Sequence, residues 1–405
     1  MKDVDRRAFL KRAGAASVGL AVWSNASAET STSTPADQGA DAWLEVDLGN
    51  LAWNLDQIRR RVNNRPVMAV IKANAYGHGL VEVGKALEKQ QIGYLAVGKV
   101  QEALRLRESG VTTPILNFGP FARDEAEALI RHDIAQSVFT DEVAYLAEAA
   151  RTLGRTAAVH VKVDTGLGRV GVPHERALAF VETVAATPEI SIAEIFTPFS
   201  EEEDFDRVQL DRFVQICEGA KRRGIDVGLR HAASSAGVIS FPEAYLDMVR
   251  PGIALYGQYP STREYQARRI DLRPAMSLKT RVTYVKTLRP GDAVSYHRAF
   301  VAEHDTDVAT ISMGYSDGYP YQAVEKAEVI VQGQRWPAIA LVTSNHMTLD
   351  VTGAANLEIG QEAVLFGEQG AVEIAAEEVA AWAGTSVYKI LIGMSPLLPR
   401  TYLGA

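Results

Sequence analysis

The chain has 405 residues, a formal net charge of −8, 47% hydrophobic residues, 23% charged residues and one cysteine, Cys217. These values are ordinary for a soluble globular protein with room for one large domain and a smaller one. The negative charge argues against nucleic acid as a partner, because a polyanion needs a basic face, and a lone cysteine excludes an internal disulfide, so we interpret Cys217 as a packing residue.

The first 28 residues are typical of an export signal. Arg6 and Arg7 precede a short apolar run at 13–22, and an A-S-A cleavage site follows at 26–28. The apolar run is too short to span a bilayer, so no membrane anchor is expected. We predict a twin-arginine-type signal at 1–28, a flexible leader at 29–42 and a periplasmic protein. The alternative is an amphipathic N-terminal helix in which the paired arginines occur by chance.

From about residue 67, short apolar runs alternate with longer amphipathic segments. The runs are candidates for buried parallel strands, and the segments are candidates for helices. Eight such units favour a closed (β/α)8 TIM-type barrel, at 43–271, over an open sheet. The predicted strands are 67–72, 94–98, 114–118, 134–139, 158–163, 192–196, 227–231 and 246–250, and the predicted helices are 81–89, 102–108, 123–131, 141–153, 174–186 and 206–223.

After about residue 271 the pattern changes to short β-rich runs separated by turn signals. One helix, at 375–383, interrupts them. We predict a second, mostly β domain at 272–405. Its predicted strands are 278–288, 308–313, 329–331, 337–342, 347–351 and 363–366.

Lys72 ends the first predicted barrel strand, in the string AVIKANAYGHG at 69–79. Barrel enzymes place their chemistry at the C-terminal ends of the strands. The preceding apolar residues would desolvate the amine, which lowers the pKa of a lysine and suits it to Schiff-base formation. A strand-end lysine that extends into water is the commoner arrangement, and position alone does not distinguish the two.

The whole string resembles the cofactor-binding segment of the alanine racemase family, in which this lysine holds pyridoxal 5'-phosphate as a Schiff base. Four more strings match the family in the same order: VDTGLGRVG (163–171), HAASS (231–235), VRPGIALYG (249–257) and GYSDGY (314–319). One such string is weak, whereas five in order over about residues 43–402 are specific. The resemblance implies a racemase that interconverts L- and D-amino acids, with alanine as the expected substrate.

The resemblance also implies site residues. Lys72 and Tyr315 would be the catalytic bases on opposite faces of the substrate, with His231 against the pyridine ring. Lys162 matches a lysine that is often carbamylated. In this family the tyrosine reaches the partner's cofactor, so a homodimer is expected. Cofactor binding is assigned to Lys72, Tyr76, Arg169, His231, Ser235, Arg250, Gly252, Ile253 and Tyr388, and substrate binding to Arg169 and Ser344.

Two of these residues carry a physical argument. A phenol has a pKa of about 10, so Tyr315 needs nearby positive charge, such as Arg169, to act as a base. Arg250 is expected beside the pyridine nitrogen, where an arginine cannot accept a proton. The nitrogen then stays unprotonated and draws electrons less strongly, which disfavours transamination and favours prompt reprotonation. A purely structural arginine in an ion pair is the alternative.

The sequence also departs from the family pattern. Pro198 replaces a histidine that supports the catalytic tyrosine, Ser344 and Asn345 replace a methionine and an aspartate, and Ser234 replaces an asparagine. These changes predict a roomier, more polar pocket, so a periplasmic racemase of broad specificity for larger or polar amino acids is the alternative function.

Other functions fit less well. A barrel-type decarboxylase with the same cofactor typically has an acid at the position of Arg250 and a cysteine late in the chain, and no cysteine follows Cys217. A non-catalytic binding protein would not need Lys72 and Tyr315. The eight histidines have no H-E-x-x-H or H-x-H spacing, so no metal site is predicted.

Overall fold

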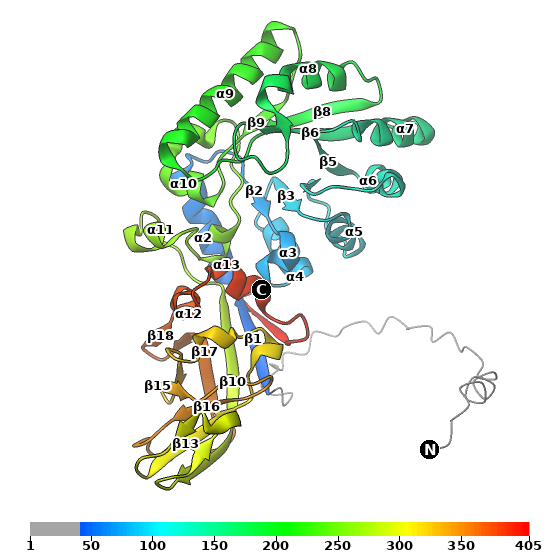
Figure 1. Cartoon of the computed structure of the whole chain (residues 1–405). Helices are drawn as coiled ribbons and strands as arrows, with labels where there is room; N and C mark the ends of the chain where they lie inside the picture. The colour runs from blue at the N-terminus through cyan, green and yellow to red at the C-terminus, as the bar shows by residue number, and fades with distance from the viewer. Residues whose placement is uncertain (1–40, 405) are drawn as a thin grey trace, which may run out of the picture. The chain divides into compact units, whose positions relative to one another are not determined.

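A computed structural model describes residues 41–404, and the predicted export signal at 1–28 lies outside them. Within the described residues, no helix combines the length and the apolar character needed to cross a membrane. Two β structures with their covering helices account for nearly all of this part of the chain (Figure 1).

The first β structure is a parallel barrel whose strands follow one another in chain order. The predicted eighth strand, at 246–250, is reduced to two bridges: Met248 pairs with His231, and Val249 pairs with Val67. These bridges close the ring between its first and last strands. The seven regular strands are β2 (Met68–Val70), β3 (Tyr94–Val97), β4 (Ile115–Asn117), β5 (Ile134–Val138), β6 (Ala157–Asp164), β8 (Ile190–Phe196) and β9 (Leu229–His231).

Helices cover the outside of the barrel because each has one apolar face (Figure 1). In α4, for example, Leu80, Val83 and Leu87 are buried at helical spacing. The covering helices are α2 (Leu48–Arg61), α4 (Leu80–Lys89), α5 (Val100–Glu108), α6 (Ala126–Arg131), α7 (Val143–Leu153), α8 (His174–Ala185), α9 (Glu203–Arg222) and α10 (Ser235–Ser240).

The second β structure confirms the mostly β character predicted for the C-terminal part. Strand β10 pairs with both β13 and β17, so six strands close into a ring, and the helices α12 (Ala376–Trp382) and α13 (Val387–Gly393) follow it. The six strands are β10 (Met276–Leu288), β13 (Thr306–Ile311), β14 (Glu328–Val331), β15 (Gln334–Ile339), β16 (Met347–Asp350) and β17 (Glu362–Gln369).

The first described strand, β1 (Ala42–Asp47), belongs to this second sheet and not to the barrel. It lies antiparallel to β10, with Leu44 opposite Leu278, and parallel to β19 (Arg400–Leu403). Its buried residues Trp43, Leu44 and Val46 anchor it there. Helix α2 begins directly after β1 and covers the barrel, so the chain enters the second sheet first and leaves it last.

Candidate active site

A cavity of about 410 Å³ opens at the C-terminal ends of the barrel strands. Side chains reach it from the ends of β2, β6 and β8 and from the closing segment after Met248, as expected for the catalytic end of a barrel. The predicted residues that line it together are Lys72, Tyr76, Lys162, Arg169, Ser235, Arg250, Gly252, Ile253 and Tyr388.

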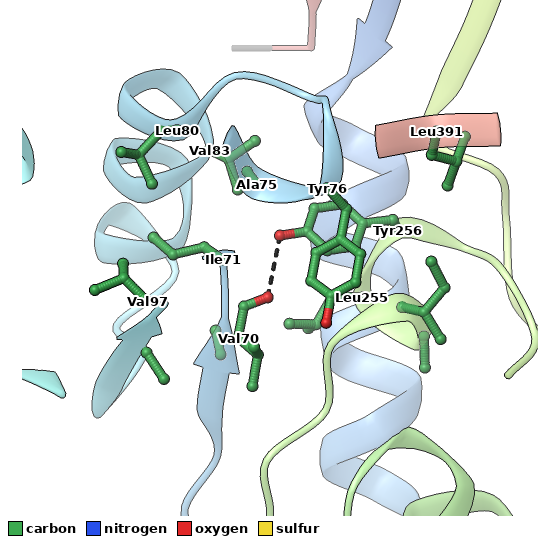
Figure 2. Packing of buried hydrophobic residues seen from close by; sticks show 14 of the residues in the cluster. Val70, Ile71, Ala75, Tyr76, Leu80, Val83, Val97, Leu255, Tyr256 and Leu391 are labelled. Atoms are coloured by element: carbon green, nitrogen blue, oxygen red, sulfur yellow. Dashed lines mark hydrogen bonds between the residues drawn. The ribbon is translucent and has the colours of Figure 1, made fainter. Parts of the chain in front are cut away.

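The chain makes a left-handed turn directly after Lys72, in the short helix α3 (Lys72–Tyr76). The four residues 73–76 all have φ between 52° and 56°, a conformation that is costly for residues other than glycine. Asn74 holds the turn, since its N–H donates to Glu102 Oε1 (3.0 Å) and its Oδ1 accepts from Leu80 N–H (2.9 Å). Figure 2 shows Tyr76 packed next to Tyr256, whose hydroxyl donates to the Val70 carbonyl (3.2 Å).

The two cavity lysines are electrostatically unusual. Burial lowers the pKa of the Lys72 amine, and the nearby charge of Arg169 lowers it further against the opposing effect of Glu102. Burial also lowers the pKa of Lys162 to about 8, with Arg169 and Arg250 adding to the shift. An amine with a lowered pKa is unprotonated more often, so both lysines are suited to attack a carbonyl carbon.

One end of the cavity is a small polar recess, which we call the cup: Tyr76, Ser235, Gly252, Ile253 and Tyr388. Ser235 Oγ accepts hydrogen bonds from the N–H groups of Gly252 (2.9 Å) and Ala254 (3.2 Å). A β-carbon on Gly252 would lie 2.5 Å from Tyr76 Oη, so a larger residue there would displace the Tyr76 hydroxyl from the cup. Ile253 begins the 3-10 helix η3 (Ile253–Tyr256), so its N–H has no partner within the helix. Such a recess suits a phosphate group.

Behind the cavity, Arg250 belongs to a buried network of polar side chains that was not predicted from the sequence. Arg250 Nη1 donates to His231 Nδ1 (2.8 Å), which leaves the proton of the neutral imidazole on Nε2, 2.9 Å from Glu194 Oε2. The same carboxylate oxygen lies 3.1 Å from His160 Nδ1. His231 is therefore fully buried behind Arg250 and is not among the cavity-lining residues.

The pKa values of the groups in this network follow from their burial and from their contacts with one another. Burial alone would raise the pKa of Glu194, but its contacts with His160 and His231 lower it to about 2. Burial lowers the pKa of His231 to about 3, and Arg250 contributes to the shift. A buried carboxylate thus faces a buried guanidinium across a neutral imidazole. The ligand atoms of His160, Glu194 and His231 lie within 4.8 Å of one another, a cluster that the sequence spacing did not reveal.

Tyr315 and Ser344 lie elsewhere, in the second β structure. Tyr315 begins the 3-10 helix η5 (Tyr315–Asp317) and is 54% exposed. Its N–H donates to the Thr343 carbonyl (3.0 Å), and the Ser344 carbonyl accepts from Ser316 N–H (3.0 Å) and Oγ (2.6 Å). We call Tyr315, Ser316, Ser344 and Asn345 the Tyr315 corner. The structure brings these residues together, but none of them lines the barrel cavity of the same chain.

Several other residues line the cavity without having been predicted as site residues, and three of them bear on its chemistry. Pro198 stands where the family has histidine, Phe196 stacks on His231 with ring centroids 5.0 Å apart, and Glu201 places a carboxyl group near Ser234. Phe196 ends strand β8 and Pro198 lies two residues beyond it, so their position at a strand end was the available signal. Glu201 lies in the loop between β8 (Ile190–Phe196) and α9 (Glu203–Arg222), where no sequence pattern marked it.

The chain matches two family models in tandem. The model described as "Alanine racemase, N-terminal domain" covers residues 46–260, and the model described as "Alanine racemase, C-terminal domain" covers residues 275–402. This protein belongs to the alanine racemase family.

Curated relatives and solved structures agree with this membership. An alanine racemase from Desulforamulus reducens is 37% identical over 89% of this chain and 99% of its own length. The structure of alanine racemase from Clostridium difficile 630 has 32% identity and a TM-score of 0.85, over 90% of this chain and 96% of that one. The structure of the Bacillus anthracis enzyme with bound L-Ala-P has 31% identity and a TM-score of 0.82, over 90% and 95%.

The protein is therefore an amino-acid racemase whose family depends on pyridoxal 5'-phosphate. The residues of the cavity fit that cofactor. A lysine with a lowered pKa suits the aldehyde, the cup suits the phosphate, and Arg250 offers a hydrogen-bond donor for the ring nitrogen.

Proposed function

We propose that this racemase interconverts L- and D-alanine with Lys72 and Tyr315 as its two bases. The observation that carries the proposal is the Lys72 amine, desolvated in a cavity that also contains the cup. Sodium borohydride should fix pyridoxal 5'-phosphate irreversibly on Lys72, as read by peptide mass spectrometry. Labelling of Lys162 in its place would contradict the assignment.

Each cavity residue has a defined task in this proposal. When bound, pyridoxal 5'-phosphate supplies a conjugated ring that accepts the electron pair left by the departing α-proton. Lys72 holds the cofactor and, once the substrate amine displaces it, moves a proton at the α-carbon from one face. Arg169 orients the substrate carboxylate, and Arg250 donates a hydrogen bond to the ring nitrogen without giving up its proton. Lys162 is the candidate for carbamylation, because an unprotonated amine reacts with carbon dioxide.

Tyr315 serves the opposite face from a second copy of the chain. Supporting this, the Tyr315 corner is exposed and lies apart from the cavity within one chain. The test is a mixed dimer of one Lys72→Ala chain and one Tyr315→Phe chain, purified with two different tags. Because one of its two sites would be intact, it should have about half of the wild-type activity, whereas each variant alone is inactive. A mixed dimer without activity would contradict the shared site.

A second candidate function is racemisation of larger or polar amino acids. Pro198 in the cavity favours it, as do Ser344 and Asn345 in the Tyr315 corner. Incubating the enzyme with a panel of L-amino acids in deuterium oxide measures α-proton exchange for each. Exchange confined to alanine would exclude the broad alternative.

We also propose that the protein is exported to the periplasm in a folded state by the signal at 1–28. Replacing Arg6 and Arg7 together with lysine should retain the protein in the cytoplasm, as read by cell fractionation. An Arg12→Lys control should still be exported. Equal export of both variants would contradict a twin-arginine signal.

A further inference from the structure

One acidic side chain, Glu201, lines the cavity beside the cup. It lies in the loop between β8 and α9, with φ of +65°, and its Oε1 accepts a hydrogen bond from Ser234 Oγ (3.4 Å). Ser234 directly precedes the cup residue Ser235, and Glu201 lines the same cavity as Ser235 and Tyr388, so its carboxyl group lies beside the cup. In agreement, the negative charge of Glu201 adds to the rise that burial causes in the pKa of Tyr388. Among residues 41–404, no side-chain ion pair includes Glu201.

The groups packed behind Glu201 do not neutralise it. Asp206 on α9 accepts the backbone N–H of Glu201 (3.1 Å) and adds negative charge. A side cavity of about 120 Å³ behind Glu201 is lined by Arg207, Arg263 and Glu264, among others. The two arginines there are paired with other acids, since Arg263 lies 2.9 Å from Glu203 and Arg207 lies 3.5 Å from Glu243.

The groups in front of Glu201 belong to the main cavity. Tyr76 and Tyr388 are neutral phenols whose pKa burial raises, so they carry no compensating charge. The cations that line this cavity are Lys72, Lys162, Arg169 and Arg250. Arg250 already faces Glu194 across His231, so its charge is balanced from behind.

A phosphate monoester in the cup would conflict with an ionised Glu201. Such a group carries between one and two negative charges near pH 7, and a like charge nearby favours the neutral form of a carboxyl group. Partial burial already raises the pKa of Glu201, and the negative charge of Asp206 raises it further. The hydrogen bond from Ser234 lowers this pKa but does not cancel the rise. Solvent still reaches this carboxyl group through the open cavity. A bound phosphate would displace that solvent and add negative charge, and both changes act in the same direction.

We propose that Glu201 takes up one proton from solvent when the cup binds a phosphate monoester, and returns it when the phosphate leaves. The inference rests on the proposed function, because it assumes that the cofactor phosphate lies in the cup. By linkage, affinity for the phosphate-bearing cofactor then falls as the pH rises above the pKa of the free Glu201 carboxyl group. The affinity falls by up to about tenfold per pH unit, over the pH range in which Glu201 is protonated in the bound protein but ionised in the free protein.

The test compares the cofactor-free full chain with its Glu201→Gln variant. Calorimetric titration with pyridoxal 5'-phosphate in two buffers of different ionisation enthalpy gives the number of protons taken up at each pH. Wild type should take up close to one proton more than Glu201→Gln, and its affinity should fall more steeply between pH 5.5 and 8.5. Glu218→Gln is the matched control, because Glu218 is exposed on α9 and lines neither cavity, and it should behave as wild type.

Two further measurements keep the test decisive. Pyridoxal, which lacks the phosphate, should show no difference in proton uptake between wild type and Glu201→Gln. Ser234→Ala removes the hydrogen bond that favours the carboxylate, so the fall in affinity should move to higher pH even if Glu201→Gln folds poorly. Equal proton uptake by wild type and Glu201→Gln, or the same difference with pyridoxal, would overturn the inference. Failure of wild type to bind pyridoxal 5'-phosphate at any pH would instead overturn the proposed function.

Discussion

The barrel cavity and the Tyr315 corner differ in how their polar side chains are exposed to solvent. In and behind the cavity, Lys162, Arg250 and His231 are buried. Arg250 and His231 are hydrogen-bonded to each other, whereas burial and neighbouring cations lower the pKa of Lys162. In the Tyr315 corner the backbone is fixed by hydrogen bonds to residues 343 and 344, but the tyrosine ring is half exposed. Burial makes the first region chemically reactive within one chain. In the second region the backbone is hydrogen-bonded, but the phenol of Tyr315 stays in contact with solvent within one chain.

The largest expected effect is the loss of racemisation when the cavity lysine is removed. Lys72→Ala removes the amine that holds the cofactor, so racemisation should fall by at least about 10³-fold. The absorbance of the lysine-bound cofactor should disappear as well. Lys85→Ala, on the exposed face of α4, is the control and should keep both properties. Retained racemisation by Lys72→Ala would place the chemistry elsewhere.

The next largest effect concerns the Tyr315 corner. Tyr315→Phe removes one base, so solvent exchange of the α-proton should fall by about 10²–10⁴-fold for one enantiomer and far less for the other. Deuterium uptake from L- and D-alanine, followed by mass spectrometry, measures both. Tyr321→Phe is a matched control, because its ring lies 6.5 Å from that of Tyr315. Small and equal losses for the two enantiomers would argue against two bases on opposite faces.

A third variant changes the kind of reaction and not only its rate. Arg250→Glu would place an acid beside the expected position of the ring nitrogen, where a carboxyl group could share a proton with that nitrogen and strengthen its pull on electrons. Transamination should rise by about tenfold or more relative to racemisation, read as pyruvate formed from alanine. An unchanged ratio would remove this account of Arg250.

The smallest effect concerns stability in acid. Burial lowers the pKa of His78 to about 4 and that of His231 to about 3, so both are neutral in the folded chain. Unfolding takes up their protons below about pH 6.5, and stability should fall by about 1.4 kcal/mol per pH unit for each histidine. Thermal unfolding between pH 7 and 4.5 measures the slope. His78→Asn should flatten it, whereas His132→Gln, at an exposed site, should leave it unchanged.

Much of the fold could be predicted because apolar runs and strand ends are local signals. Seven of the eight predicted barrel strands overlap regular strands, and the eighth survives only as bridges at Met248 and Val249. Helix α2 was missed although Leu48, Leu51, Leu55 and Ile58 have helical spacing after the Asp47 cap. Strand β1 could not be assigned from pattern alone, because its partners lie at residues 276–280 and 400–403.

The candidate site was predictable in parts. The strings placed Lys72, Ser235 and Arg250 because each follows a strand or the segment that replaces one. Glu194 was missed because a single acid within an apolar strand does not reveal that two histidines from neighbouring strands face it. Likewise, the sequence locates Tyr315 in a turn, but only the structure shows it apart from the cavity of its own chain.

Strand β1 is synthesised long before either of its partners, β10 and β19. The barrel ring closes with residues up to about 250, so all of its strands are synthesised before β10. The last strand of the second sheet is β19, which covers the free side of β1. Until β19 is synthesised, β1 presents unpaired N–H and C=O groups to any other extended chain, which makes the unfinished protein prone to aggregate. Loss of residues 400–403 would make that temporary hazard permanent.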